Sequence, residues 1–197
     1  MGRSKIIPIQ QPDDNTCGPS SLKIALKILG GTKSLPNLIN LCKTGKNGTS
    51  TQNLIRAANS LGLSVLAVEY ATLRHLKSAL KYSSNQPRAV MVSYLYDLDK
   101  KGKPHPESGH WAVVASYMSD KSRIVLLDSA SAQKKSYAWS GFRHRWMDYD
   151  LKRRNITQKH RSFQLVRKWQ PQLMMILAKN ADFLPKFIIK TQKMYIP

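Results

Sequence analysis

A cysteine at a predicted helix start is the residue in this sequence best suited to covalent chemistry. It is Cys17, and four apolar residues follow it at helical spacing, namely Leu22, Ala25, Leu26 and Leu29. Pro19 agrees with a helix that begins there, because proline is tolerated in the first turn. The positive end of the helix dipole favours a thiolate, the nucleophilic form of cysteine. Alone, however, such a cysteine is more often a small buried apolar residue.

A candidate general base, His110, begins one predicted strand, and Asp128 ends the next. The two positions are nearly symmetric about the turn signal Ser119–Ser122. An antiparallel hairpin with a shift of about one residue, or with a bulge, would bring the two side chains together. A carboxylate beside an imidazole fixes its tautomer, and the imidazole can then accept the proton of Cys17. Taken alone, His110 would equally well be a buried core histidine.

Residues beside these three could complete a site. Gln11 lies six residues before Cys17 and could donate to an oxyanion together with the backbone N–H of Cys17. Gln10 is an adjacent competitor that spacing alone does not exclude. Gly18 and Gly109 carry no side chain, so we expect a substrate backbone to approach closely there.

The sequence contains further aromatic, cysteine and histidine residues that could belong to a site or to the core. Trp111 follows the candidate base and either lines a substrate cleft or packs in the core; both alternatives stay open, and it is kept as a candidate substrate-binding residue. Cys42 lies on the apolar side of a predicted helix, which indicates a core residue. The histidines at 75, 144 and 160 show no metal-ligand spacing, so we expect neither a metal nor a cofactor.

Composition limits the class of protein. The 197 residues suit one domain with a hydrophobic core. Two cysteines rule out a scaffold of several disulfides. No apolar run approaches the ~18 residues that a membrane span needs, and no signal peptide is recognisable. We therefore expect a cytoplasmic protein with free thiols and without a membrane span.

The charge is strongly positive. Lys and Arg number 32 against 11 Asp and Glu, which gives a formal net charge of +21. Basic residues are densest between Lys134 and Lys193, above all at Lys152-Arg153-Arg154. This excess either attracts nucleic acid, an acidic partner or an anionic surface, or is a solvated face. No spacing typical of a nucleic-acid-binding module is present.

The chain changes character near Pro87. Before it, apolar spacing predicts helices at 17–29, 35–42, 50–61 and 73–80, with a strand at 64–70. After it, strands are predicted at 89–96, 111–118, 123–127, 163–168 and 173–178, with a short helix within 137–149. These elements indicate an α+β fold, with N-terminal helices packed on a C-terminal antiparallel sheet. We expect a single domain at 1–181 and a basic, loosely attached tail at 182–197.

Five short features follow one another in a characteristic order between residues 5 and 150. They are Gln11, Cys17-Gly18, Gly48-Thr49-Ser50, Gly109-His110 and Asp128. Their order and spacing resemble those of the double-glycine leader peptidases, papain-like cysteine peptidases of the bacteriocin-processing type. Because no transporter segment is found, a free-standing member is expected.

The resemblance implies a papain-like fold and a peptide or protein substrate. Cys17 would be the nucleophile, and His110 the general base and then the acid. Asp128 would orient the imidazole, and Gln11 would help to form the oxyanion hole. The reaction implied is hydrolysis of a peptide bond through a thioester.

Three other functions remain open from the sequence. The fold could bind peptides without cutting them. The same triad could transfer the acyl group to another acceptor, or deamidate a side chain. The basic surface could instead serve a nucleic-acid-associated protein.

Overall fold

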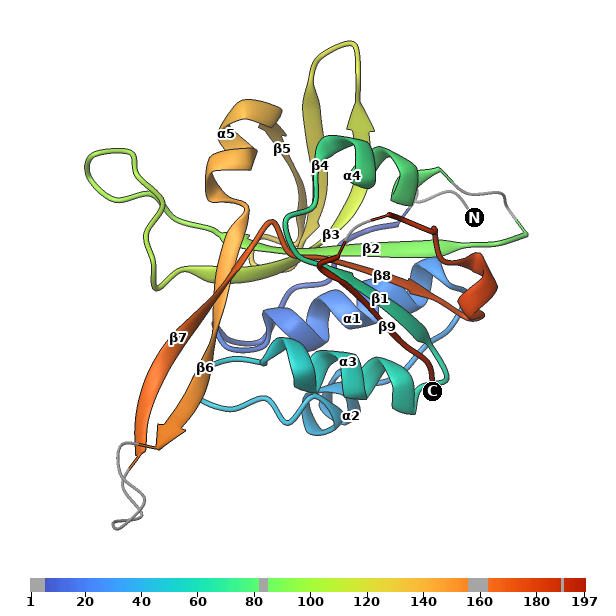
Figure 1. Ribbon diagram of the computed structural model, residues 1–197, viewed down its shortest axis with the longest axis horizontal. Coiled ribbons are helices and arrows are strands. Elements are labelled where there is room, and N and C mark those ends of the chain that lie inside the picture. The colour runs from blue at the N-terminus through green and yellow to red at the C-terminus, as the bar shows by residue number, and fades with distance from the viewer. Residues whose placement is uncertain (1–5, 82–84, 156–162, 189) are drawn as a thin grey trace.

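In the part of the chain that the structure describes, seven strands form one antiparallel sheet, and two more form a separate hairpin (Figure 1). The structure, a computed structural model, describes residues 6–81, 85–155, 163–188 and 190–197. Its helices are α1 (Cys17–Ile28), α2 (Leu35–Leu41), α3 (Thr51–Ser60), α4 (Leu73–Leu80) and α5 (Trp139–Arg145). Its strands are β1 (Ser64–Val68), β2 (Arg88–Leu95), β3 (Gly109–Met118), β4 (Arg123–Asp128), β5 (Gln133–Ala138), β6 (Met147–Asn155), β7 (Phe163–Pro171), β8 (Met174–Ala178) and β9 (Gln192–Tyr195).

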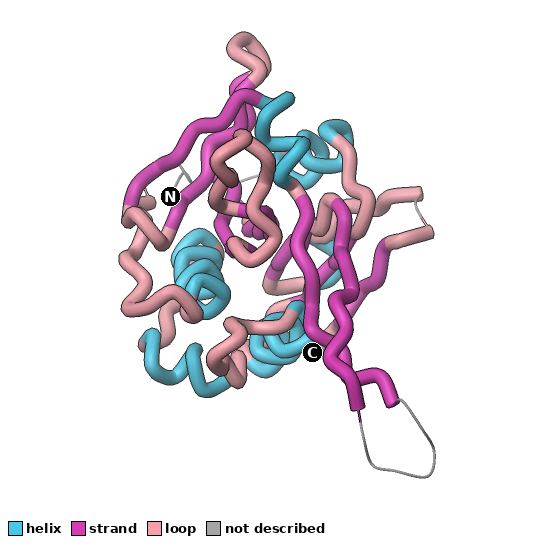
Figure 2. Tube along the Cα trace, turned by 90° about the vertical axis from the view of Figure 1, so that its left-hand side faces the viewer, coloured by secondary structure: helices cyan, strands magenta, loops and turns pink. Residues whose placement is uncertain are grey.

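The large sheet has the order β5-β4-β3-β2-β8-β1-β9, and β6 pairs with β7. Helices cover both faces: α1, α2 and α3 lie on one side, and α4 and α5 on the other (Figures 1 and 2). The central strands β2 and β8 are buried almost throughout. This explains their continuous apolar runs, since a strand covered on both faces has no solvent side to alternate with.

The predicted α+β class is confirmed, and local signals in the sequence explain the helix starts. Ser50 caps α3 by accepting a hydrogen bond from the backbone N–H of Asn53. Thr72 and His75 form a capping box at the start of α4. The predicted helix within 137–149 is shorter than expected, because 133–138 is strand β5 and β6 begins at Met147.

The hairpin that was expected to join His110 and Asp128 is present, with a different register. The pairs Val113–Leu127 and Val114–Leu126 are followed by a bulge, after which Ser116 pairs with Val125. Continuing this ladder would place Ala112 opposite Asp128. His110 is therefore a diagonal neighbour of Asp128, a distance that side chains can bridge.

The C-terminal segment is more closely attached than the sequence suggests. Residues Gln192–Tyr195 form β9, which pairs with β1 at the edge of the large sheet. The side chain of Asn59 also donates to the carbonyl of Tyr195. The expectation of a loosely attached tail was wrong for this stretch, because a short polar strand gains its stability from pairing rather than from an apolar pattern.

Candidate active site

The start of α1 positions the candidate nucleophile. Cys17 is the first residue of the helix, and its exposed fraction is only 5%. Gly18 packs against Thr49, and a Cβ atom at Gly18 would lie 2.9 Å from the Thr49 Cβ. The expected reason for this glycine was access for a substrate backbone. The contact gives it another role, which is to let the loop before α3 pack closely beside the cysteine.

One hydrogen bond connects α1 directly to the strand that carries the candidate base. The Ser21 hydroxyl donates to the Trp111 carbonyl over 2.8 Å, and both groups are buried. Trp111 itself is 4% exposed and belongs to the core between α1 and the sheet. Its position favours the core alternative over a wall of the substrate cleft. The bond fixes the helix start relative to the neighbouring residue, His110.

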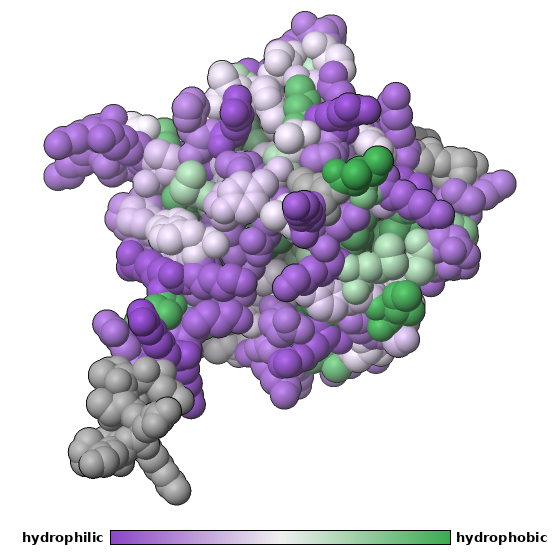
Figure 3. Space-filling view, viewed as in Figure 1, coloured by the Kyte–Doolittle hydropathy of each residue, from purple (hydrophilic) through white to green (hydrophobic). Residues whose placement is uncertain are grey.

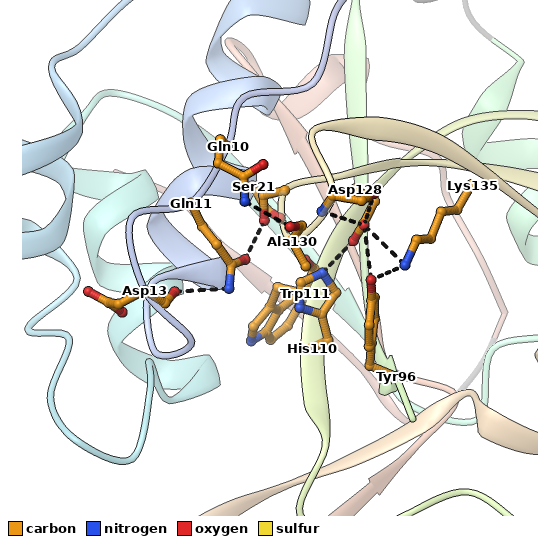
Figure 4. Close-up of polar contacts among 12 residues, drawn as sticks. Gln10, Gln11, Asp13, Ser21, Tyr96, His110, Trp111, Asp128, Ala130 and Lys135 are labelled. Carbon is orange, nitrogen blue, oxygen red and sulfur yellow. Dashed lines mark hydrogen bonds and ion pairs between the residues drawn. The ribbon is translucent and has the colours of Figure 1, made fainter. Parts of the chain in front are cut away.

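His110 and Asp128 meet in a buried pair. His110 Nε2 lies 2.7 Å from Asp128 Oδ1, and the aspartate is completely buried (Figure 4). The other carboxylate oxygen accepts hydrogen bonds from the backbone N–H of Ser131 at 3.0 Å and from its hydroxyl at 2.6 Å. Because Nε2 is engaged by the carboxylate, Nδ1 is the ring nitrogen left for the thiol.

Electrostatics favour a charged imidazole. Burial by itself would lower the pKa of His110, but hydrogen bonds with Asp128 and with the Cys17 side chain outweigh it and raise the pKa to about 9. Burial likewise acts to raise the pKa of Asp128, but the bonds from His110 and Ser131 hold it below its usual value. The arrangement therefore stabilises an imidazolium beside a carboxylate.

The two candidate glutamines have different surroundings. Gln11 is 8% exposed; its Oε1 accepts from the Ser129 hydroxyl, and its Nε2 donates to the Asp13 carbonyl over 2.9 Å. Gln10 is exposed, and its amide donates to the carbonyl of Ala130. Fixing Oε1 sets the orientation of the Gln11 amide, which keeps a second N–H that the Asp13 carbonyl does not use.

Sequence reasoning missed two residues beside the pair. The Tyr96 ring lies 4.8 Å from the His110 ring, centroid to centroid. Lys135 lies over the Tyr96 ring at 3.8 Å, donates to its hydroxyl, and places Nζ 3.5 Å from Asp128 Oδ2. Neither residue belongs to a motif in the sequence. Lys135 comes from a polar edge strand, and only the pairing of β4 with β5 brings it to the site.

A third missed residue is Asp148, at the start of β6. A Cβ atom at Gly109 would collide with its carboxylate, so this glycine is required by the packing of Asp148. Burial raises the pKa of Asp148 to about 7, and the nearby charge of Asp150 acts in the same direction. Asp148 therefore adds a second carboxyl group next to His110.

The two cysteines are both free but differ in their surroundings. Cys42 is completely buried, and burial raises its pKa to about 12. Its predicted place in the core is confirmed. Among the residues that the structure describes, no group of His, Cys, Asp or Glu side chains is arranged to hold a metal ion. In the same ranges, no helix is both long and apolar enough to cross a membrane.

The fold is that of the papain-like cysteine peptidases, as three solved structures show. The peptidase domain of Streptococcus ComA, a bifunctional ABC transporter involved in quorum sensing, is similar with a TM-score of 0.63 and 19% identity, over 89% of this chain and 99% of that chain. A double-glycine-motif protease from an AMS/PCAT transporter, in complex with the leader peptide, is similar with a TM-score of 0.55 and 16% identity, over 90% of this chain and 94% of that chain. The Streptococcus mutans ComA peptidase domain is similar with a TM-score of 0.53 and 18% identity, over 88% of this chain and 98% of that chain.

Within that class, the chain belongs to the Peptidase C39 family, whose family model matches residues 5–155. The resemblance inferred from the sequence motifs is thereby confirmed. No curated protein matches the sequence.

Proposed function

We propose that the protein is a cysteine peptidase in which Cys17, His110 and Asp128 act as the catalytic triad. The observation that carries the proposal is the buried His110–Asp128 bond of 2.7 Å. The Cys17 side chain supports it, because its presence beside the ring helps to raise the pKa of His110. Membership of a peptidase family supports the reaction class. The similar protease with a bound leader peptide supports a peptide substrate.

In the first half of the reaction, the Cys17 sulfur attacks the carbonyl carbon of the scissile bond while His110 holds the thiol proton. The negative oxygen lies between the Gln11 amide and the N–H of Cys17, because the first N–H groups of a helix have no partner within it. The imidazolium then protonates the departing amine as the C–N bond breaks, which leaves a thioester on Cys17.

In the second half, water attacks the thioester. His110 accepts a proton from that water as the new C–O bond forms, and the C–S bond breaks to release the carboxylic acid. Asp128 keeps Nε2 engaged throughout, so that Nδ1 faces the sulfur in both halves. The protein ends the cycle in its starting protonation state.

The test is product analysis by mass spectrometry on a panel of peptides that includes a leader peptide ending in Gly-Gly. We expect cleavage into an acid and an amine by the wild type, and none by Cys17→Ala. Cys42→Ala is the matched control and should retain cleavage.

Two outcomes would contradict the proposal. Products that carry an added amine nucleophile, with no free acid in its absence, would indicate a transferase. A protein that binds peptides but yields neither cleavage nor a covalent adduct on Cys17 would be a binding module.

A further inference from the structure

Arg145, the last residue of α5, is a buried cation without an acidic partner. The residue is only 8% exposed, and its Cζ lies 5.3 Å from the centre of the Tyr137 ring. No other residue that the structure describes forms an ion pair or a hydrogen bond with its side chain. A ring face balances part of the charge, but it cannot accept the five N–H donors of a guanidinium. Because buried arginines are normally paired, an acceptor is missing here.

A second donor close to Arg145 also lacks an acceptor. The Tyr94 hydroxyl is buried, and it has no hydrogen-bond partner among the described residues. The Tyr94 ring packs against the ring of Tyr137 at 5.9 Å. Burial raises the pKa of Tyr94, and the nearby charge of Arg145 acts in the opposite direction. The hydroxyl therefore keeps its proton and adds a second unpartnered donor to this part of the molecule.

Lys135 brings a second cation to the same place. Lys135 and Tyr137 are two positions apart on β5, so their side chains lie on the same face of the strand. Burial lowers the pKa of Lys135, and the charge of Arg145 lowers it further. The Lys135 side chain is 30% exposed, which leaves the cluster open to solvent.

The residues around these two cations do not balance their charge. Hydrophilic side chains dominate the face of the molecule that carries α5 (Figure 3). Nevertheless, residues 129–147, which include β5 and α5, contain neither Asp nor Glu. The carboxylate nearest to Lys135 is Asp128 at 3.5 Å, and Lys135 shares it with His110. Burying cations without counter-charge is unfavourable, so the cluster favours an anion from solution.

The donors indicate the class of that anion. The planar fork of Arg145 matches two oxygens of a phosphate or a carboxylate, and Lys135 adds a point charge. Two neighbouring cations balance a dianion, whereas a carboxylate carries a single negative charge. The small exposed fraction of Arg145 suits a small ion, because a nucleic-acid backbone needs an open cationic groove. Free phosphate has both the charge and the size.

We propose that Arg145, Lys135 and the Tyr94 hydroxyl form a binding site for a small phosphate dianion, and that the bound ion acts on His110 through Lys135. The site lies on the face of the sheet that α5 covers, away from the helix that carries Cys17. Lys135 opposes the charged form of His110 and competes with it for Asp128. A dianion beside Lys135 offsets that effect, and the coupling between the two sites is reciprocal.

Isothermal titration calorimetry of the wild type near pH 8, where a phosphate is dianionic, tests the site. The probes are sodium phosphate, sodium acetate and a short single-stranded oligonucleotide, with the ionic strength held constant by NaCl. We expect saturable binding of phosphate, and binding of acetate that is weaker by at least about tenfold. Arg145→Gln and Lys135→Met should each weaken phosphate binding by at least about tenfold.

The matched control is Arg143→Gln, which removes one positive charge from an exposed position of the same helix. It should leave phosphate binding within about twofold of the wild type. Lys135→Met alters a partly exposed position, so it decides the matter if Arg145→Gln does not fold. Equal phosphate affinity of Lys135→Met and the wild type would overturn the site. Acetate binding as tight as that of phosphate, or displacement of phosphate by the oligonucleotide, would overturn the phosphate assignment.

The effect on His110 is measured without any substrate. Its ring is titrated by NMR with and without saturating phosphate, and His110→Gln identifies its signal. Phosphate should raise the pKa of His110 by about half a pH unit in the wild type and leave it unchanged in Lys135→Met. Phosphate that binds without moving this titration would overturn the coupling. None of these measurements depends on cleavage, so the proposed peptidase function can fail or hold independently of this site.

Discussion

The protonation state of His110 is decided by two opposing effects within one side chain's surroundings. Burial disfavours the imidazolium, whereas Asp128 and Cys17 favour it, and their effect dominates, so that the pKa lies at about 9. Below that pH the ring is charged and can protonate the leaving amine. Above it the ring loses this proton, so a peptidase that uses it should lose activity.

The first prediction is a pH profile. For the wild type, we expect kcat/KM to fall on the basic side with a midpoint near pH 9. Asp128→Asn removes the main favourable interaction, so burial should move the midpoint to lower pH and kcat should fall by a factor on the order of 10²–10⁴. Asp120→Asn, in the exposed turn of the same hairpin, is the control and should keep both values. A basic limb unaffected by Asp128→Asn would contradict the assignment.

The second prediction concerns Lys135, whose ammonium lies 3.5 Å from the carboxylate that holds His110. The ammonium group repels the imidazolium of His110 and competes with it for the carboxylate of Asp128. Lys135→Met should therefore raise the midpoint of the basic limb, by about half a pH unit because the side chain is partly exposed to solvent. Lys135→Arg keeps the charge and should leave the midpoint near 9. A lower midpoint in Lys135→Met than in the wild type would show that the lysine does not disfavour the imidazolium.

The three candidate triad residues could be singled out from the sequence because each occupies a position with a local signal. Cys17 precedes a helical repeat, and His110 and Asp128 flank a recognisable hairpin. Lys135 and Asp148 have no such signal. They approach the site through strand pairing and through packing on Gly109, which depend on the whole fold.

Among the elements, α1 and β3 must be fixed relative to each other for the sulfur to reach the ring. The Ser21–Trp111 bond connects them, and Gly18 lets the Thr49 loop close against the helix start. Thr49 is nearly buried, and its hydroxyl bonds with that of Thr44 over 2.7 Å, so it cannot easily move away. The close approach at Gly18 is therefore a structural requirement.

The third prediction follows from that contact. Gly18→Ala would gain at most about 1 kcal/mol of helix propensity. The clash with Thr49 should cost about 1–3 kcal/mol, so we expect a lower urea midpoint. Gly45→Ala is the matched control, since a Cβ atom there would have no neighbour within 4 Å. A Gly18→Ala protein as stable as the wild type would show that the loop adapts.

The elements differ in how far the sequence predicts them. The buried strands β2 and β8 were predicted because their apolar runs are continuous. The strands β5, β6 and β9 were not. β5 is largely exposed and polar, β6 carries three consecutive basic residues, and β9 is only four residues long. These segments become strands because they pair with other strands, which lie across a turn or far away in the sequence. Local propensity does not encode such pairing.

For the molecule as a whole, β9 closes the edge of the large sheet. It pairs with β1 over four positions, and Tyr195 packs against the core cluster on the side of the sheet that α1, α2 and α3 cover. Without it, β1 would present an unpaired edge to solvent and to other chains. The C-terminal segment thus contributes to the stability of the domain that holds the site, although it lies outside the motifs.

The fourth prediction tests this contribution. Deleting residues 192–197 should lower the free energy of unfolding by about 2–4 kcal/mol, at roughly 1 kcal/mol for each of a few lost ladder bonds. Deleting residues 196–197 alone keeps β9 and should change it little. Urea denaturation followed by circular dichroism measures both. Equal stability of the two truncated proteins would mean that β9 adds nothing to the fold.

If the sulfur of Cys17 and the ring of His110 act as one unit, the reactivity of the thiol depends directly on the imidazole. The measurement is the rate of iodoacetamide alkylation of the folded protein at pH 6, mapped to each cysteine by mass spectrometry, for the wild type and for His110→Ala. We predict that Cys17 is alkylated rapidly in the wild type, at least about tenfold more slowly in His110→Ala, and that Cys42 is inert in both. Alkylation of Cys17 at the same rate with and without the imidazole, or preferential alkylation of Cys42, would contradict the coupling of Cys17 and His110.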